Sequence, residues 1–256
     1  VDKQGKIPFP YRIHDTPDLD KLAPYAEFAK TLGYPINLKT PETIAHSFNA
    51  MVKDSATHPD HKILQTLGIR TMAKAVYSTV NIGHYGLAFK HYCHFTSPIR
   101  RYPDVLVHRV LMECLEKQIQ PKKEMEEWCK HCSEKERKAM EAEREGNKYK
   151  QVEFMQQHIG DVLEGVISGV ASFGFWVETI AHKCEGLVNI VSLTDYDDFR
   201  LVEADYSLVG RRSGRSFRMG DKVMIRVVAA NLEKRQLDYE WVLQAAVEKP
   251  VKKSKR

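Results

Sequence analysis

The spacing of the hydrophobic positions changes once along the chain, near residue 158. Before that point apolar residues recur every three to four positions, which is the spacing of one face of an α-helix. Start signals such as Thr40-Pro41 and stop signals such as Gly33 divide this pattern into segments. They predict helices over residues 18–32, 40–52, 60–77 and 97–117, and a long charged helix from Pro121 to about His158.

After Gly160 apolar and polar residues alternate, which is typical of half-buried β-strands. The alternation predicts strands over residues 162–167, 173–178, 186–188 and 222–228. Short strands separated by glycine turns favour a small antiparallel barrel. We therefore predict an α+β protein with a mostly helical domain at 1–158, a barrel domain at 159–244 and a disordered basic tail at 245–256.

Composition adds a few limits to this picture. The chain has 256 residues, of which 43% are hydrophobic, so it is long enough to bury a core. No apolar run approaches the roughly 18 residues that a membrane span needs, so we expect no membrane partner. The formal net charge of +5 is a mild hint of a polyanionic partner. The chain opens at Val1 without a methionine or a signal-peptide pattern, and we expect it to be a piece of a longer protein.

The five cysteines are an odd number at uneven spacings, which favours a reducing cytoplasm over a secreted disulfide framework. Cys129 and Cys132 have the spacing of a redox or zinc motif. However, they lie inside a helical pattern, and no second cysteine pair follows at zinc-ribbon spacing. We interpret them as small residues on a core-facing stripe.

The segment around Ser97-Pro98-Ile99-Arg100-Arg101 contains the densest chemical signal. A serine followed by proline predicts a helix start, where unpaired backbone N–H groups and the helix dipole favour an anion. Two arginines in a first turn are unfavourable to that dipole unless an anion compensates them. A phosphate could accept from both the backbone and a guanidinium group. The alternative is an ordinary helical ion pair between Arg100 and Asp104.

The long helix contains two carboxylates, Glu136 and Glu143, on an otherwise apolar or small stripe. Such carboxylates need partners if the stripe is buried. One interpretation is that the edge of the stripe is solvated. The other is that Glu143 hydrogen-bonds an arginine or a ribose hydroxyl.

Small barrels often bind single-stranded nucleic acid through aromatic side chains and a positive groove. In a regular strand Phe173 and Phe175 would share one face and Trp176 would lie on the other. The segment 200–226 combines glycines with an excess of basic residues, namely Arg211, Arg212, Arg215, Arg218 and Lys222. We expect a flexible basic loop there that contacts a phosphate backbone.

Three segments carry a specific pattern, namely residues 10–17, residues 83–89, and the run His94-Phe95-Thr96-Ser97-Pro98-Ile99-Arg100-Arg101-Tyr102-Pro103-Asp104 with His108-Arg109. Together they resemble the ribonuclease R and ribonuclease II (RNB) family of processive 3'-to-5' exoribonucleases. Residues from Gly160 to about Val242 resemble the OB-fold RNA-binding domain that follows the catalytic domain in that family. The resemblance implies the C-terminal part of an RNB-type catalytic domain followed by an OB-fold barrel.

The resemblance also implies roles for single residues. Arg100 matches the family's catalytic arginine, which holds the phosphate near the scissile bond, and Thr96, Ser97 and Arg101 lie in the same RNA-binding block. Glu143, in Ala142-Glu143-Arg144-Glu145, would contact the 3'-terminal nucleotide. On the barrel, the expected RNA-binding residues are Phe173, Trp176 and Arg235. Asn189 and Asn231 depart from the family pattern, which usually has histidine and aspartate there.

The family hydrolyses RNA to nucleoside 5'-monophosphates with Mg²⁺ held by clustered aspartates. No such cluster is found in this sequence, and its one Asp-Asp pair, Asp197-Asp198, falls in the barrel. We therefore expect the metal ligands in a missing upstream half, and no hydrolysis by this chain alone. The expected partner is the 3' end of single-stranded RNA, bound by a cytoplasmic monomer. The alternative is a non-catalytic RNA-binding module with the same fold.

Overall fold

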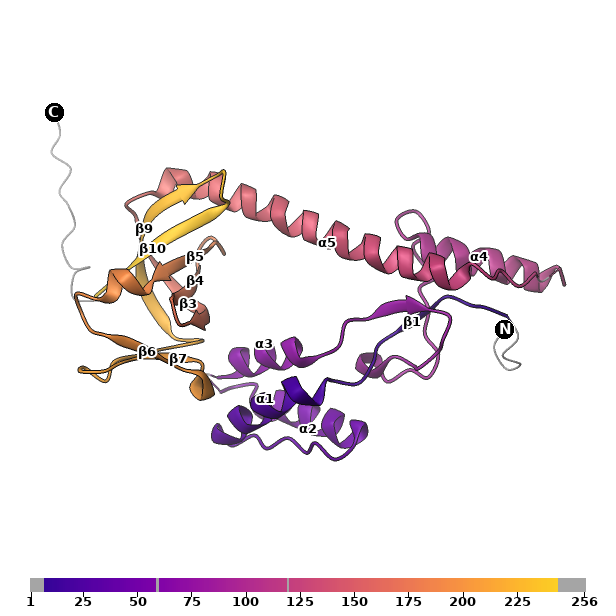
Figure 1. The fold of residues 1–256 in the computed structure, drawn as a ribbon, viewed down its shortest axis with the longest axis horizontal. Coiled ribbons are helices and arrows are strands. Elements are labelled where there is room, and N and C mark those ends of the chain that lie inside the picture. Colours follow the sequence, from indigo (N-terminus) through magenta and orange to yellow (C-terminus); the bar gives the residue numbers. More distant parts are fainter. Residues whose placement is uncertain (1–6, 59, 119, 244–256) are drawn as a thin grey trace. The chain divides into compact units, whose positions relative to one another are not determined.

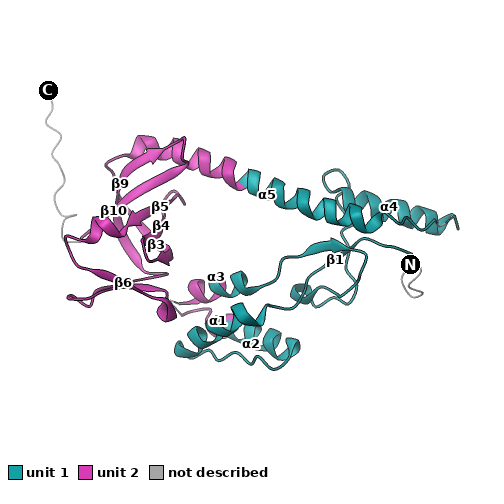
Figure 2. Cartoon of the chain, viewed as in Figure 1, with its two compact units in different colours: residues 1–51, 67–143 teal, residues 52–66, 144–256 magenta. Residues whose placement is uncertain are grey.

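The computed structural model describes residues 7–58, 60–118 and 120–243, which form two compact units (Figures 1 and 2). Unit 1 comprises residues 1–51 and 67–143, and unit 2 comprises residues 52–66 and 144–256. Three helices run across the limits between the units, so neither unit is a single continuous stretch of chain. The predicted tail at 245–256 lies outside the described residues. No helix in the described ranges combines the length and apolarity that a membrane crossing requires.

The helices of the first 71 residues follow the sequence signals closely. Helix α1 (Leu19–Thr31) begins at Asp18, whose carboxylate accepts a hydrogen bond from the Asp20 amide at 3.1 Å. Helix α2 (Pro41–Asp54) begins after Thr40, as predicted, and the Thr40 hydroxyl accepts from the Thr43 amide at 3.3 Å. Helix α3 spans His61–Thr71.

The prediction that the third helix continues to Tyr77 is wrong. Strand β2 (Val76–Ser78) pairs antiparallel with β1 (Tyr11–Ile13), and Tyr77 lies opposite Arg12. The β-branched and aromatic residues of this short segment suit a strand, and the pairing partner lies more than sixty residues away. A local helical pattern could not reveal that partner.

The second half of unit 1 contains one turn of 3₁₀-helix, η1 (Tyr85–Leu87), and helix α4 (Tyr102–Leu115). The long helix α5 (Met125–Met155) follows and ends in η2 (Gln156–His158). Both cysteines of the CxxC motif are buried in a cluster with Tyr77, Leu106, Val110 and Met125. The interpretation of Cys129 and Cys132 as core residues is confirmed.

The barrel of unit 2 is closed by five strands. They are β3 (Val162–Ala171), β4 (Gly174–Thr179), β5 (Glu185–Asn189), β9 (Lys222–Asn231) and β10 (Gln236–Val242). Their order around the barrel is β10-β5-β4-β3-β9, and every pairing is antiparallel except β10 with β5. The sequence predicted four of these strands. It missed β10, although Leu237, Tyr239 and Trp241 alternate into the core.

The segment between β5 and β9 forms a second, three-stranded sheet. It contains η3 (Ile190–Leu193), β6 (Phe199–Val202), η4 (Glu203–Asp205), β7 (Ser207–Gly210) and β8 (Ser216–Arg218). Strand β7 lies between β6 and β8, with antiparallel pairing on both sides. Phe199, Leu208 and Phe217 pack from this sheet into the barrel core. The prediction of a flexible basic loop over 200–226 is therefore wrong.

Candidate nucleic-acid interface

The block that contains Arg100 is a tight turn before helix α4 rather than the first turn of that helix. The Ser97 carbonyl accepts hydrogen bonds from the amides of Arg100 and Arg101, at 3.3 and 3.1 Å. Helix α4 begins only at Tyr102, with Arg101 at the N-cap position. The prediction of a helix start at Ser97 is thus wrong by five residues, because the serine and proline fold into a turn of their own.

The Asp104 side chain stabilises this turn. Its side chain is fully buried, and its Oδ1 accepts from the Ser97 amide at 2.8 Å and from Arg101 Nη2 at 2.9 Å. Arg101, not Arg100, is therefore the ion-pair partner of Asp104, which corrects the alternative drawn from the sequence. Two buried atoms of this pair, Asp104 Oδ2 and Arg101 Nε, have no hydrogen-bond partner among the described residues.

Arg100 is left exposed by this arrangement. In the described part of the chain no carboxylate forms an ion pair with its side chain, and Thr96 beside it is also exposed. The Ser97 carbonyl thus fixes the backbone of both arginines, the Asp104 carboxylate neutralises Arg101, and the Arg100 side chain is exposed to solvent. A free guanidinium group next to a helix N-terminus is a suitable site for a phosphate.

A tyrosine–histidine pair lies close to the turn. The Tyr77 hydroxyl and His94 Nδ1 are 2.8 Å apart. Burial, followed by the positive charges of Arg101 and Arg12, lowers the pKa of His94, so the ring is neutral at pH 7. Burial raises the pKa of Tyr77 to about 12, so its hydroxyl is neutral as well. The positive charge of this region therefore comes from arginines.

The two carboxylates on the stripe of α5 have different surroundings. Glu136 accepts two hydrogen bonds from Arg12, at 2.5 and 3.1 Å, and the Arg12 guanidinium lies 4.6 Å from the centre of the Tyr77 ring. Glu143 is exposed and has no ion pair with any described residue. In the described chain Glu143 is therefore solvated and bonds no arginine, and its contact with a ribose hydroxyl stays a prediction. Glu136 is the carboxylate that binds the arginine.

The barrel presents an aromatic pair. Phe173 lies in the turn between β3 and β4, is 49% exposed, and contacts Trp176 in a T-shaped arrangement with the ring centres 5.4 Å apart. Phe175 points the other way and stacks on Phe217 in the core. The prediction that Phe173 and Phe175 share a face is therefore wrong.

Glycines explain this geometry. Gly174 has a φ of +148°, and a side chain there would collide with the Val188 carbonyl, so the chain turns between Phe173 and Phe175. Gly169 lies opposite Trp176 in the β3–β4 pairing, and the missing side chain leaves room for the indole. The pairing of Phe173 with Trp176, which the family resemblance implied, is the one that the backbone allows.

Arg235 lies in the turn between β9 and β10, in a left-handed conformation with a φ of +52°. It forms an ion pair with Glu145 of α5. The two asparagines that depart from the family pattern have local roles. Asn189 accepts from the Val191 amide at 2.9 Å, and Asn231 accepts from the Lys234 amide at 2.9 Å. Glu145 was not predicted, because its partner lies 90 residues away in the sequence.

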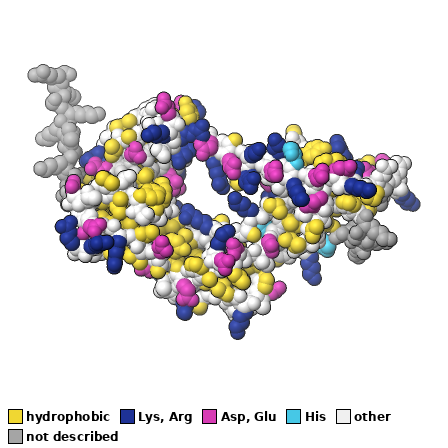
Figure 3. Space-filling model, in the orientation of Figure 1, with side chains coloured by type: hydrophobic (Ala, Val, Ile, Leu, Met, Phe, Trp, Pro, Cys, Tyr) yellow, Lys and Arg dark blue, Asp and Glu magenta, His cyan; other side chains and the backbone are white. Residues whose placement is uncertain are grey.

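The basic segment 211–218 is held by a buried aspartate. Asp197 accepts hydrogen bonds from the amides of Arg212 and Ser213 and from the Ser213 hydroxyl, at 3.1, 2.6 and 2.6 Å. These bonds, led by those from Ser213, hold the pKa of Asp197 below its ordinary value. Arg211 pairs with Asp198 at 3.2 Å and Arg212 with Asp197 at 3.3 Å. On the visible surface, basic side chains are interspersed with acidic ones (Figure 3).

No group of three or more His, Cys, Asp or Glu side chains that could hold a metal ion occurs within residues 7–58, 60–118 and 120–243. Asp197 and Asp198 are engaged with Arg212 and Arg211, as described above. The described residues therefore do not fit the aspartate cluster that the resemblance implies, and no step through a magnesium ion can be derived from them.

Comparisons with known proteins agree with this architecture. Residues 2–117 match the RNB domain. Ribonuclease R of Aquifex aeolicus is 40% identical over 236 residues, which are 91% of this chain and 33% of that protein. The structure of Mycoplasma genitalium RNase R in complex with ribose methylated single-stranded RNA has a TM-score of 0.83 at 28% identity, over 93% of this chain and 38% of that one.

A more distant likeness concerns the fold alone. Yeast Ssd1, described as a pseudonuclease, has a TM-score of 0.59 at 20% identity, over 80% of this chain and 26% of that one. This chain spans about a third of the length of the curated ribonuclease R relatives that it matches. The RNB match, the 40% identity and the common architecture agree: residues 2–117 belong to the RNB-domain family, and the chain is similar to ribonuclease R over most of its length.

Proposed function

We propose that this chain is the RNA-holding part of a processive 3'-to-5' exoribonuclease that releases nucleoside 5'-monophosphates. One observation carries the proposal. In the Ser97–Arg101 turn, Asp104 neutralises Arg101 and leaves Arg100 exposed and without an ion pair in the described chain. The Mycoplasma genitalium relative, which has been captured with single-stranded RNA, supports RNA as the partner.

In this proposal Arg100 binds a phosphate of the RNA backbone through its planar pair of N–H donors. The N-terminus of α4, which follows directly, contributes its positive dipole end. Arg101 has a different role, because its Nη2 already donates to Asp104. It is a positioning residue that keeps the turn closed, and Thr96 and Ser97 lie beside the bound phosphate. Glu143, exposed on α5, is available to accept from the sugar of the terminal nucleotide.

The barrel would hold the strand further from its end. Its closed order β10-β5-β4-β3-β9 supports an OB-fold, a fold that binds single strands through aromatic side chains and a positive groove. Phe173 is the exposed ring on which a base would stack, Trp176 holds that ring from its side, and Arg235 would contact the backbone. The ion pair with Glu145 orients Arg235 and partly neutralises its charge, which weakens its attraction for phosphate. We therefore assign the larger share of RNA binding by the barrel to Phe173.

Hydrolysis in the proposed reaction depends on Mg²⁺, which would activate water and stabilise the leaving oxygen. The described residues of this chain hold and orient RNA. In the proposal the metal ligands belong to another part of the longer protein.

The proposal can be tested by fluorescence anisotropy, which measures the binding of a single-stranded RNA that has a fluorescein label at its 5' end and an unmodified 3' end. Arg100→Ala should weaken binding about tenfold, because a charge-assisted contact to phosphate is lost. Arg137→Ala is the matched control, since Arg137 is an exposed arginine of α5 whose partner is Glu141. Equal affinities of the Arg100→Ala and Arg137→Ala proteins would rule out the role of Arg100.

A second candidate is a non-catalytic RNA-binding module with the same fold. The fold also occurs in yeast Ssd1, which is described as a pseudonuclease. Both candidates require RNA affinity that falls steeply with salt, since phosphate contacts release counterions. They differ in catalysis. The longer protein should release 5'-mononucleotides from RNA with Mg²⁺, and Arg100→Ala should reduce that rate at least tenfold. An RNA-binding but inactive protein would support the module.

A further inference from the structure

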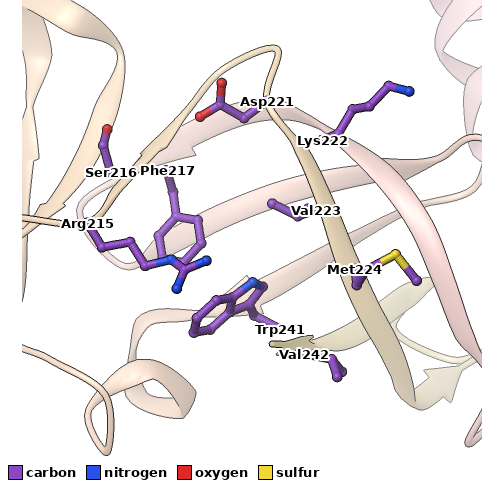
Figure 4. A pocket seen from close by; sticks show the side chains of 9 residues that line it. All are labelled: Arg215, Ser216, Phe217, Asp221, Lys222, Val223, Met224, Trp241 and Val242. Atoms are coloured by element: carbon purple, nitrogen blue, oxygen red, sulfur yellow. The ribbon is translucent and has the colours of Figure 1, made fainter. Parts of the chain in front are cut away.

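A small cavity of about 250 Å³ lies in unit 2, between the start of β9, the end of β10 and strand β8. Figure 4 shows the side chains around it, and those that matter here are Arg215, Phe217, Asp221, Lys222, Met224 and Trp241. Phe217 and Trp241 are only 2% and 4% exposed, so the accessible lining is mostly polar, and the exposed Arg215 lies over these buried rings.

The main feature of the cavity is an arginine laid over a tryptophan. The Arg215 guanidinium lies 4.3 Å from the centre of the Trp241 ring and 5.9 Å from the centre of Phe217 (Figure 4). Trp241 is only 4% exposed, and the edges of Tyr196 and Phe217 fix it, with ring centres 4.8 and 5.1 Å away. Because the indole cannot move, it gives the guanidinium a fixed plane on which to rest.

The charge of Arg215 differs from that of its neighbours. Arg211 and Arg212 each have a carboxylate partner within 3.3 Å, whereas no described residue forms an ion pair with Arg215. An aromatic ring orients a guanidinium group without neutralising it or using its N–H donors. Arg215 therefore keeps its full charge and its donors, in one orientation, at the edge of a cavity.

We propose that this cavity binds one nucleotide unit, with its phosphate on the N–H donors of Arg215 and its base stacked on the exposed face of the guanidinium plane. Proteins use this arrangement for unpaired bases. Lys222 also lines the cavity, but its ammonium group pairs with Glu164 at 3.4 Å, so the phosphate is assigned to Arg215 alone. A cavity of about 250 Å³ suits a single small unit and excludes an extended ligand.

This site lies apart from Arg235 of the proposed RNA-binding face. Lys222 begins β9, and Arg235 lies in the turn that follows the end of β9 at Asn231. Nine residue steps of a strand separate the two ends of β9 by about 30 Å. The nucleotide can come from two sources, a free mononucleotide or one unit of an RNA strand. The RNA source rests on the proposed function, whereas the free nucleotide does not.

The test uses the indole N–H signals of the three tryptophans in ¹H–¹⁵N NMR spectra of the full chain, assigned by Trp→Phe substitutions. Three probes are added separately: adenosine 5'-monophosphate, a ten-residue oligoadenylate and inorganic phosphate. The proposal expects the Trp241 signal to shift with the mononucleotide or the oligonucleotide, and much less with inorganic phosphate. A shift with the mononucleotide identifies a free-nucleotide site, and a shift with the oligonucleotide alone identifies a strand site.

The variant Arg215→Ala should weaken this binding about tenfold, and Arg215→Lys should lose part of it, because lysine keeps the charge but not the planar fork. Arg211→Ala removes the same charge from the same segment and should change the affinity less than twofold. Equal losses in the Arg215→Ala and Arg211→Ala proteins, or a Trp241 signal that no probe shifts, would overturn the site.

The same spectra separate this site from the proposed function. An oligonucleotide that shifts Trp176 but not Trp241 overturns the cavity site and leaves the RNA-binding barrel standing. A mononucleotide that shifts Trp241, together with an oligonucleotide that leaves Trp176 unchanged, supports the cavity site and contradicts the proposed barrel face. Equal shifts of Trp241 with inorganic phosphate and with the mononucleotide would overturn the recognition of a base.

Discussion

Two buried aspartates each hold an arginine-bearing turn, one in each unit of the molecule. In unit 1 the fully buried Asp104 accepts from the Ser97 amide and from Arg101. In unit 2 Asp197, which is 2% exposed, accepts from the amides of Arg212 and Ser213 and from the Ser213 hydroxyl. In both places a buried carboxylate decides which arginines are neutralised.

The two turns differ in how completely they are satisfied. Both oxygens of Asp197 have hydrogen-bond partners within the chain, so the turn of the barrel is complete by itself. In the other turn Asp104 Oδ2 and Arg101 Nε are buried without a partner in the described chain. A buried polar atom without a hydrogen bond costs about 1–3 kcal/mol. The turn at Arg100 therefore keeps a cost that the turn at Arg212 does not.

The largest effect should come from Asp104→Ala. This change leaves Arg101 half-buried without its partner and removes the acceptor of the Ser97 amide, so it should destabilise the protein by about 3 kcal/mol. The free energy of unfolding in urea measures this loss. Asp104→Asn is the control, because its side-chain oxygen can still accept both bonds, and it should lose clearly less. Equal losses would mean that charge alone, rather than hydrogen bonding, holds the turn.

Asp197→Ala should have a smaller effect, a decrease of the melting temperature on the order of 5 °C. The change leaves two backbone amides without their acceptor, but the Arg212 side chain is largely exposed and can be solvated. Thermal unfolding followed by circular dichroism measures the decrease. Asp198→Ala is the matched control, since it removes an exposed carboxylate at the neighbouring position. The order of the two turns would be reversed if Asp197→Ala lowered the free energy of unfolding in urea by more than Asp104→Ala does.

The depressed pKa of Asp197 predicts a pH dependence. The folded pKa lies below the ordinary value of about 3.9, so the stabilisation by Asp197 is complete above that value. It is lost as the pH falls from about 4 toward the folded pKa. The Asp197→Asn protein lacks this titration and should lose less stability than the parent between pH 5 and pH 2. Parallel losses over this range would show that other carboxylates account for the acid sensitivity.

The sequence was sufficient where local periodicity decides the structure. The helix over 18–32 followed from its apolar spacing, and the start of α2 after Thr40 followed from a capping residue. It was insufficient where the deciding partner is distant. Asp197 meets Ser213 sixteen residues later, and Arg215 meets Trp241 in another strand. For this reason the sequence predicts a flexible basic loop where the structure has an ordered sheet, and it does not distinguish Arg215 from its neutralised neighbours.

The same limit applies to the candidate site. The sequence correctly grouped Thr96, Ser97, Arg100 and Arg101 in one segment, because they are consecutive or nearly so. It could not tell which arginine pairs with Asp104, since a helix from Ser97 would favour Arg100 and the observed turn favours Arg101. The observed helix starts five residues after the predicted start, and this difference exchanges the roles of the two neighbouring arginines.

The smallest effect is expected from Arg211→Ala. The Arg211–Asp198 pair is exposed on both sides, with 64% and 66% of the side chains accessible, so solvent and salt screen it. The melting temperature should change by no more than about 1 °C, at low and at high salt. The hydrogen bonds to Asp197 come from Asp198, Arg212 and Ser213, so the loss of the Arg211 side chain removes an ion pair and leaves these bonds intact. A loss as large as that of Asp197→Ala would show that surface charge, not the buried carboxylate, holds the turn of the barrel, and the parallel between Asp104 and Asp197 would fail.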